Sequence, residues 1–229
     1  MSTILCIETA TEICSVAVVS ETSILSLCEN HEGNAHASQL TGLIETALKE
    51  AGLTLQQLDA IAVSKGPGSY TGLRVGVSTA KGLCYALDKP LIAVPTLQSL
   101  AAQFVQTQEL GDSDLLLPML DARRMEVYCA GYDKNLLEKR ATEAAIIDGN
   151  SFAAELENGN VYFFGNGAAK CQPTITHPNA QFMAGVFCSA KGMSGLAVKA
   201  FQEGRFEDVA YFEPFYLKDF VGTTPRKLV

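Results

Sequence analysis

Lys65-Gly66-Pro67-Gly68-Ser69-Tyr70-Thr71-Gly72-Leu73-Arg74 is the stretch that decides the fold, because it joins an apolar strand, predicted over residues 60–64, to a helix, predicted over residues 72–87. Glycine adopts backbone angles that other residues resist and proline fixes one of its own, so this turn is neither strand nor mid-helix. Ser69 or Thr71 can cap the helix. A strand, a glycine-rich turn and a helix N-terminus suit an anion or a close backbone contact. The candidate loop residues are Gly66, Pro67, Gly68, Ser69, Thr71 and Arg74.

This loop does not match the two common phosphate-binding patterns. No Gly-Lys-Ser/Thr ending follows Gly66 at the spacing of a P-loop. Gly72 comes one residue too early for Gly-x-Gly-x-x-Gly. A plain turn therefore remains an alternative to a functional loop.

One side of the helix over residues 72–87 carries no charge. The expected core face consists of Leu73, Val77, Ala80, Cys84 and Leu87. The opposite, uncharged side carries Gly72, Val75, Gly76, Thr79, Gly82, Leu83 and Ala86. A glycine inside a helix costs about 1 kcal/mol relative to alanine, so three of them on one side predict that another backbone comes close. That backbone belongs either to a second element of the same chain or to a partner subunit.

The composition predicts a globular protein with one large or two small domains. The chain has 229 residues, of which 48% are hydrophobic and 18% charged. It has no apolar run of about eighteen residues, and its N-terminus lacks a basic region, so we expect neither a membrane span nor a signal peptide. The seven cysteines are odd in number and include no CxxC pair. We expect them to be reduced core residues of a cytoplasmic protein.

The net charge of −8 argues against a chain that binds nucleic acid by itself. Phosphate binding needs a positive surface, and no block of lysine and arginine supplies one. An acidic chain can still belong to a nucleic-acid enzyme when a partner provides the basic surface.

The order of elements predicts an internal duplication. Strands are expected over residues 4–8, 14–19, 24–28, 60–64 and 90–94, with helices over 36–51, 72–87 and 95–106. A second, shorter series has strands over 115–121, 125–132, 136–141 and 161–164, a helix over 151–156, and a late helix over 189–203. We predict an α/β fold of two β-β-β-α-β-α units, the architecture of the actin, sugar-kinase and Hsp70 (ASKHA) superfold, with the second copy reduced. The expected domains are residues 1–108 and 109–229.

The predicted cleft offers little chemistry. In the superfold, the acids that end the first strand of each copy flank a nucleotide, and Glu8 and Asp121 hold these positions. The first turn, residues 9–12, has no glycine and carries an extra acid, which disfavours phosphate. The hydroxyls of Thr9 and Thr11 can still donate hydrogen bonds, so we interpret Glu8, Thr9, Thr11 and Asp121 as a vestigial cleft. His31, His36 and His177 form no zinc pair, and no Gly-x-Ser-x-Gly elbow occurs, so we predict neither metal nor catalytic residues.

Several motifs together closely resemble the TsaB (formerly YeaZ) family. They are Ile7–Thr11 with Cys14–Ala17, His36–Leu40, Gly66–Arg74, Asp121–Arg123 leading to Glu126–Tyr128, and the tail Pro214–Lys218. The match is strongest over residues 1–105. The tail has Lys218 where the family's Pro-x-Tyr-Leu-Arg ending has arginine.

The resemblance implies a non-catalytic subunit. Such proteins pair with a TsaD-like catalytic paralogue, which transfers threonylcarbamoyl to an adenosine beside the anticodon of tRNAs, and a TsaE-like ATPase joins them. TsaD-like proteins carry a His-x-x-x-His metal pair where this chain has Thr96 and Leu100. The resemblance further implies a homodimer when alone, pairing through helices of the first domain, tRNA contact only through the complex, and no membrane. It implies no cofactor of the chain's own, and a nucleotide at the subunit interface stays an open alternative.

Two other functions compete with this interpretation. An ATP-binding ASKHA-type ATPase or small-molecule kinase needs a phosphate-binding first turn, which residues 9–12 do not supply. A metalloprotease of the peptidase M22 type, a label that the wider family has carried, needs the missing metal pair.

Overall fold

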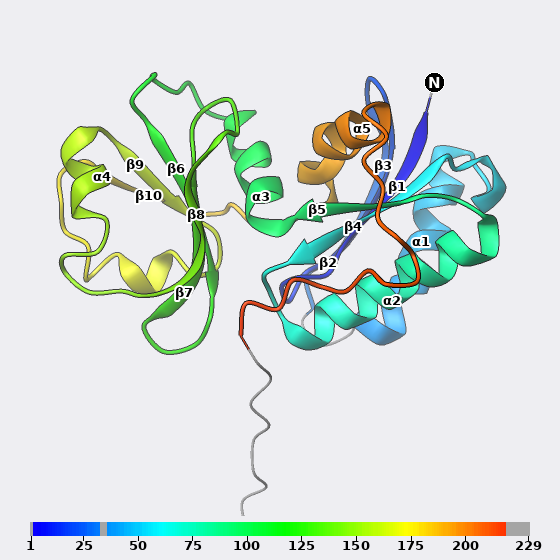
Figure 1. Cartoon of the computed structure of the whole chain (residues 1–229), viewed down its shortest axis with the longest axis horizontal. Coiled ribbons are helices and arrows are strands. Elements are labelled where there is room, and N and C mark those ends of the chain that lie inside the picture. The colour runs from blue at the N-terminus through cyan, green and yellow to red at the C-terminus, as the bar shows by residue number, and fades with distance from the viewer. Residues whose placement is uncertain (1, 33–35, 219–229) are drawn as a thin grey trace, which may run out of the picture.

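The computed structural model describes residues 2–32 and 36–218. It has two five-stranded sheets side by side, with helix α3 (Thr96–Val105) between them (Figure 1). Within the described ranges, none of the helices combines the length and the hydropathy that a membrane crossing requires.

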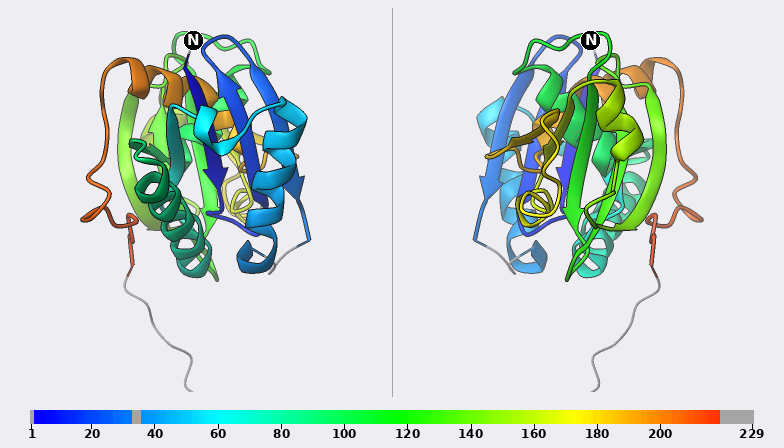
Figure 2. Two further views of the ribbon diagram at one scale, coloured as in Figure 1. Left: turned by 90° about the vertical axis from the view of Figure 1, so that its right-hand side faces the viewer. Right: turned by 90° about the vertical axis from the view of Figure 1, so that its left-hand side faces the viewer.

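The first sheet has the strand order β3-β2-β1-β4-β5. Its strands are β1 (Thr3–Glu8), β2 (Cys14–Ser20), β3 (Ile24–Asn30), β4 (Ala60–Gly66) and β5 (Leu91–Pro95). The first three strands are antiparallel, whereas β1, β4 and β5 run parallel. Helices α1 (His36–Ala51) and α2 (Tyr70–Leu87) lie side by side on one face (Figure 2). A short 3-10 helix, Leu55–Gln57, connects α1 to β4.

The second sheet repeats this order as β10-β9-β6-β7-β8. Its strands are β6 (Leu115–Asp121), β7 (Glu126–Tyr132), β8 (Glu138–Ile146), β9 (Val161–Phe164) and β10 (Ala180–Met183). Strands β6 to β8 are antiparallel, and β6, β9 and β10 are parallel, as in the first sheet. The predicted duplication of the β-β-β-α-β-α unit, with the ASKHA strand order, is confirmed.

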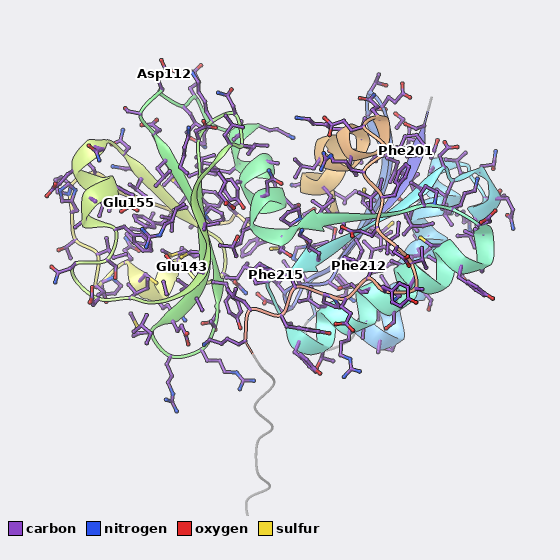
Figure 3. All side chains as sticks on the ribbon, in the orientation of Figure 1. Asp112, Glu143, Glu155, Phe201, Phe212 and Phe215 are labelled. Carbon is purple, nitrogen blue, oxygen red and sulfur yellow. The ribbon has the colours of Figure 1, made fainter. Side chains whose placement is uncertain are left out.

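The second copy is reduced in its helices. Between β8 and β9 it has only α4 (Ala153–Asn158), and between β9 and β10 only the 3-10 helix Ala169–Cys171. Arg140 on β8 connects to α4. Its guanidinium pairs with Glu143 and Glu155, which are labelled in Figure 3, and lies 4.9 Å from the ring centre of Phe152.

One strand of the second copy has other bounds than predicted, and another was not predicted. The strand expected over residues 136–141 begins at Glu138 and continues to Ile146, because Leu136 has a left-handed φ of 61° and belongs to the turn before the strand. Strand β10 was not predicted at all. It has four residues, each half-exposed, so it lacks the alternation of buried and exposed side chains that marks a strand.

Two segments pack across the predicted domain boundary. Helix α5 (Ser194–Gln202) and the 3-10 helix before it (Ala190–Met193) cover the other face of the first sheet, although they follow the second sheet in the chain. Helix α3 packs on the second sheet through Leu97, Leu100 and Phe104. We therefore call β1–β5 with α1, α2 and α5 the first lobe, and β6–β10 with α4 the second lobe. The domain limits at residues 108 and 109 stay a prediction.

Candidate functional site

A cleft with a volume of about 730 Å³ lies between the two lobes. On one side it is lined by the first turn, including Thr11 and Glu12, and by the glycine-rich loop. On the other side it is lined by residues 120–123 at the end of β6 and by Asn166. This is the position that the duplicated fold predicts for a ligand cleft.

Glu8 does not line this cleft. Its side chain is completely buried at the end of β1, where Oε1 accepts a hydrogen bond of 2.7 Å from the backbone N–H of Ala10. Within the described residues, Oε2 has no hydrogen-bond partner. Burial raises the pKa of Glu8 to about 7, although hydrogen bonds to the carboxylate act in the opposite direction. The carboxyl group is thus a partly neutral interior group at physiological pH.

The two threonines of the predicted cleft are also buried. The Thr9 hydroxyl donates a hydrogen bond of 2.8 Å to the carbonyl oxygen of Gly72 and so ties the first turn to α2. The hydroxyl of Thr11 lies beside the buried thiol of Cys188, whose pKa is raised by burial. Thr9 therefore serves packing inside the first lobe, whereas Thr11 lies between the cleft and the core cluster that contains Cys188.

Asp121 lies at the surface of the cleft and is already engaged. Its carboxylate pairs with Lys170, and Oδ1 accepts a hydrogen bond of 3.0 Å from the backbone N–H of Arg123. The structure therefore does not make Glu8 and Asp121 an equivalent pair of acids. One is enclosed in the first lobe, and the other is neutralised by a cation within the second lobe.

Asn166 joins the two sides of the cleft and was not singled out from the sequence. Its Oδ1 accepts a hydrogen bond of 3.0 Å from the N–H of Asp121, and its Nδ2 donates one of 3.0 Å to Oε2 of Glu12. The internal duplication contained the signal, because Gly165-Asn166-Gly167 lies at the end of β9 as Gly66-Pro67-Gly68 lies at the end of β4.

The two glycine turns are filled by the protein itself. A Cβ atom on Gly68 would lie 2.4 Å from the carbonyl oxygen of Ala10, and one on Gly66 would lie 2.6 Å from that of Phe215. In the second copy, a Cβ on Gly167 would lie 2.7 Å from the carbonyl carbon of Leu120. Gly66 and Gly165 both have a left-handed φ, of 109° and 99°. In the structure these turns make the close backbone contact that was one of the two predicted roles.

Ser69 caps α2, as expected, and Thr71 does not. The Ser69 hydroxyl accepts a hydrogen bond of 3.3 Å from the N–H of Gly72. Thr71 lies exposed in the first turn of the helix. One turn further, Arg74 bonds to the hydroxyl of Tyr70 at 3.2 Å, with its guanidinium 5.3 Å from the centre of that ring.

The uncharged side of α2 divides into a covered part and an open part. Gly72 and Gly76 are buried, and a Cβ on Gly76 would lie 2.2 Å from Oγ1 of Thr9. For these two glycines the approaching element belongs to the same chain. Gly82 and Ala86 are exposed, and a Cβ on Gly82 would meet nothing within 4 Å. The half-buried members of this side are Val75, Thr79 and Leu83.

Thr96 and Leu100, which occupy the positions of the metal-binding histidines expected in TsaD-like proteins, serve packing in this structure. Thr96 is completely buried, and its hydroxyl accepts a hydrogen bond of 3.1 Å from the N–H of Gly66. Leu100 lies on α3 and is buried against the second sheet. In the part of the chain that the structure describes, no group of three or more His, Cys, Asp or Glu side chains is arranged to hold a metal ion.

Comparison with known proteins gives consistent matches. A family model described as "TsaD: tRNA N6-adenosine threonylcarbamoyltransferase" matches residues 30–221. The Escherichia coli "tRNA threonylcarbamoyladenosine biosynthesis protein TsaB" is 28% identical over 96% of each chain. The Haemophilus influenzae protein of the same name is 38% identical over 55% of this chain, and that match spans only 52%, about half, of the relative's length. The solved structure of YeaZ from Pseudomonas aeruginosa superimposes with a TM-score of 0.81 at 30% identity, covering 95% of this chain and all of that one.

Proposed function

This chain belongs to the TsaB/YeaZ family, within the wider group that the TsaD model describes, and from that premise we propose that it is a non-catalytic subunit of the complex that makes N6-threonylcarbamoyladenosine beside the anticodon of tRNAs. It pairs with a TsaD-like catalytic paralogue and activates it, and a TsaE-like ATPase joins the pair. We place this complex in the cytoplasm. The acidic chain meets tRNA only through the complex, and alone it forms a homodimer. A nucleotide at the subunit interface stays an open alternative.

The open part of the α2 surface carries this proposal. Gly82 and Ala86 are exposed on a helix side without charge, and an added Cβ on Gly82 has free space around it. Helix α1 packs beside α2 and presents Gly42, which is exposed and equally unobstructed. Two neighbouring helices with small residues at their surface allow a second pair of helices to approach closely. The packing roles of Thr96 and Leu100 support a division of labour in which the partner supplies the chemistry.

Size-exclusion chromatography with light scattering tests the pairing. The protein is measured alone and mixed with the TsaD-type transferase of the same genome, as wild type and as Gly82→Arg. We expect Gly82→Arg to weaken pairing at least tenfold, because the new side chain occupies the space that the partner helix needs. Tenfold corresponds to about 1.4 kcal/mol. Pairing that is unchanged in Gly82→Arg would exclude this face.

Gly195→Arg is the matched control. Gly195 also lies within a helix, is exposed, and has no atom within 4 Å of an added Cβ, but it belongs to α5 on the other face of the sheet. We expect this variant to pair as the wild type does. Gly76→Arg is not a suitable test, because the clash with Thr9 would disturb the fold itself.

A further inference from the structure

The last described residues form an extended strap that returns from α5 toward the cleft. We define the strap as residues 206–218, drawn in orange to red in Figure 1. It begins at the edge of the first sheet, where the N–H of Glu207 donates a hydrogen bond of 2.9 Å to the carbonyl oxygen of Leu91. It then follows α2 and ends between the lobes.

The first lobe holds the strap by its backbone. Nζ of Lys81 on α2 donates hydrogen bonds to the carbonyl oxygens of Ala210 and Phe212, at 3.2 and 2.9 Å. Further along, the N–H of Phe215 donates one of 2.7 Å to the carbonyl oxygen of Lys65. Figure 3 places Phe212 beside α2 and Phe215 nearer the second lobe. These contacts bind the main chain of the strap and leave most of its side chains exposed.

The glycine-rich loop provides a shaped seat for the strap. Only a residue without a Cβ leaves room at position 66 for the carbonyl oxygen of Phe215. Next to this contact, the ring of Tyr216 packs on that of Tyr70 with the ring centres 4.9 Å apart. The loop that resembles a ligand-binding turn therefore receives a segment of its own chain.

The strap contacts the second lobe through Lys218. Its ammonium pairs with the carboxylate of Glu126 at the start of β7 and lies 5.9 Å from the ring centre of Tyr128. The Lys218 and Glu126 side chains are 37% and 23% exposed. An ion pair that solvent reaches contributes little and is screened by salt, so this end of the strap is weakly held.

The strap runs between two hollow spaces. A cavity of about 770 Å³ is lined by strap residues Tyr211 to Phe215, by Lys65, and by Tyr132 and Glu138 of the second lobe. The cleft of about 730 Å³ is lined by Tyr216, Leu217 and Lys218 on its strap side. Beside the strap the lobes are thus separated by open volume. Elsewhere they are connected by α3 and by the hydrogen bond from Asn166 to Glu12, and the strap is a further connection between them.

We propose that the strap is a releasable clasp between the two lobes. With Lys218 on Glu126, it holds the lobes at the separation seen here. With Lys218 released, the end of the strap leaves its seat on the glycine-rich loop, and the lobes move relative to one another. This proposal concerns the chain by itself and does not depend on the proposed function.

Amide hydrogen exchange on the full chain tests the release. We compare the wild type with Lys218→Ala and follow the amide of Phe215, which is bonded to Lys65, and that of Glu207, which is bonded to Leu91. We expect Phe215 to exchange about three to five times faster in the variant, the range that loss of a solvent-exposed ion pair allows. Glu207 should be unchanged. Raising the salt concentration should produce the same acceleration in the wild type and none in the variant.

Lys134→Ala is the control, because Lys134 forms an exposed ion pair with Asp112 within the second lobe. It should leave the exchange of Phe215 unaltered. Equal exchange of Phe215 in Lys218→Ala and the wild type would overturn the proposal.

Distance measurement by electron spin resonance tests the lobe movement. Spin labels are placed on Glu45→Cys in α1 and Glu157→Cys in α4, both exposed, while the seven native cysteines are buried. We expect one narrow distance distribution in the otherwise wild-type chain and a broader one, with a second population, after Lys218→Ala. An identical distribution in both would show that the strap only covers the surface, and would overturn the clasp.

Discussion

At the scale of single residues, Glu8 makes the stability of the protein depend on pH. Its folded pKa of about 7 lies above the value of 4.5 expected for an exposed glutamate, because burial disfavours the charged form. The folded state therefore binds a proton that the unfolded chain has already lost. The resulting stabilisation is fully present below about pH 4.5 and is lost as the pH rises through 7.

Glu8→Gln removes this dependence. We expect the free energy of unfolding of the variant, relative to wild type, to shift in the variant's favour by about 1 to 3 kcal/mol between pH 5 and pH 8. Urea denaturation at the two pH values measures it. Glu45→Gln, at an exposed position of α1, should show no such shift. A shift of the opposite sign in Glu8→Gln would mean that the carboxylate is stabilised in the folded protein.

The surroundings of the two acids, Glu8 and Asp121, were only partly predictable from the sequence. Glu8 and Asp121 were identified as matching positions because each ends an apolar strand, and this pattern can be recognised from neighbouring residues alone. Whether a carboxylate then faces a cleft or the interior depends on neighbours from other elements. Ala10 and Lys170 decide it here, and no local pattern reports either contact.

At the scale of elements, α2 carries two glycines with opposite surroundings, one tightly packed and one open to solvent. A Cβ on Gly76 would press on Oγ1 of Thr9, whereas one on Gly82 would point into open space. Gly82→Ala should stabilise the protein by up to about 1 kcal/mol, the difference in helix propensity. Gly76→Ala should instead cost about 1 to 3 kcal/mol, as overpacking does. Thermal or urea unfolding of the two variants measures this contrast.

A double variant identifies the cause of the Gly76 effect. Thr9→Ala removes the atom that the new Cβ would meet, so Gly76→Ala should cost clearly less in a Thr9→Ala background than in the wild type. Equal costs in both backgrounds would show that the helix at position 76 is sensitive for another reason.

The sequence predicted most elements of the first lobe, because its strands are continuous apolar runs and its helices have clear periodicity. The glycine-rich loop was also located from the sequence, because glycine and proline are strong local signals of a turn. The sequence did not identify what fills the loop. Ala10 and Phe215 are distant in sequence from Gly68 and Gly66, so no local pattern indicates these contacts. Strand β10 was missed because its side chains are all half-exposed.

At the scale of the whole molecule, Asn166 links the lobes across the cleft by bonding to both Glu12 and Asp121. Asn166→Asp keeps the acceptor for the N–H of Asp121 but places a carboxylate oxygen opposite Glu12. We expect a loss of about 0.5 to 1 kcal/mol at pH 7, the scale of an exposed polar contact, which decreases at high salt. Urea denaturation at two salt concentrations measures it.

Glu12→Gln provides the check on this explanation. With an amide at position 12, the carboxylate of Asn166→Asp has a neutral neighbour that can donate a hydrogen bond to it. The double variant should therefore recover most of the stability lost in Asn166→Asp. No recovery would mean that the cost arises within the second lobe.

The exchange of helices between the two copies has a consequence for protein synthesis. One face of the first sheet, with Ile4, Cys6 and Ala17, packs against residues of the late segment 190–201. A ribosome that adds about 5 to 20 residues per second leaves this apolar face bare for roughly 5 to 20 s after β5 has been made. The first lobe therefore cannot complete its fold during synthesis until residues 190–201, close to the end of this sequence, have been made.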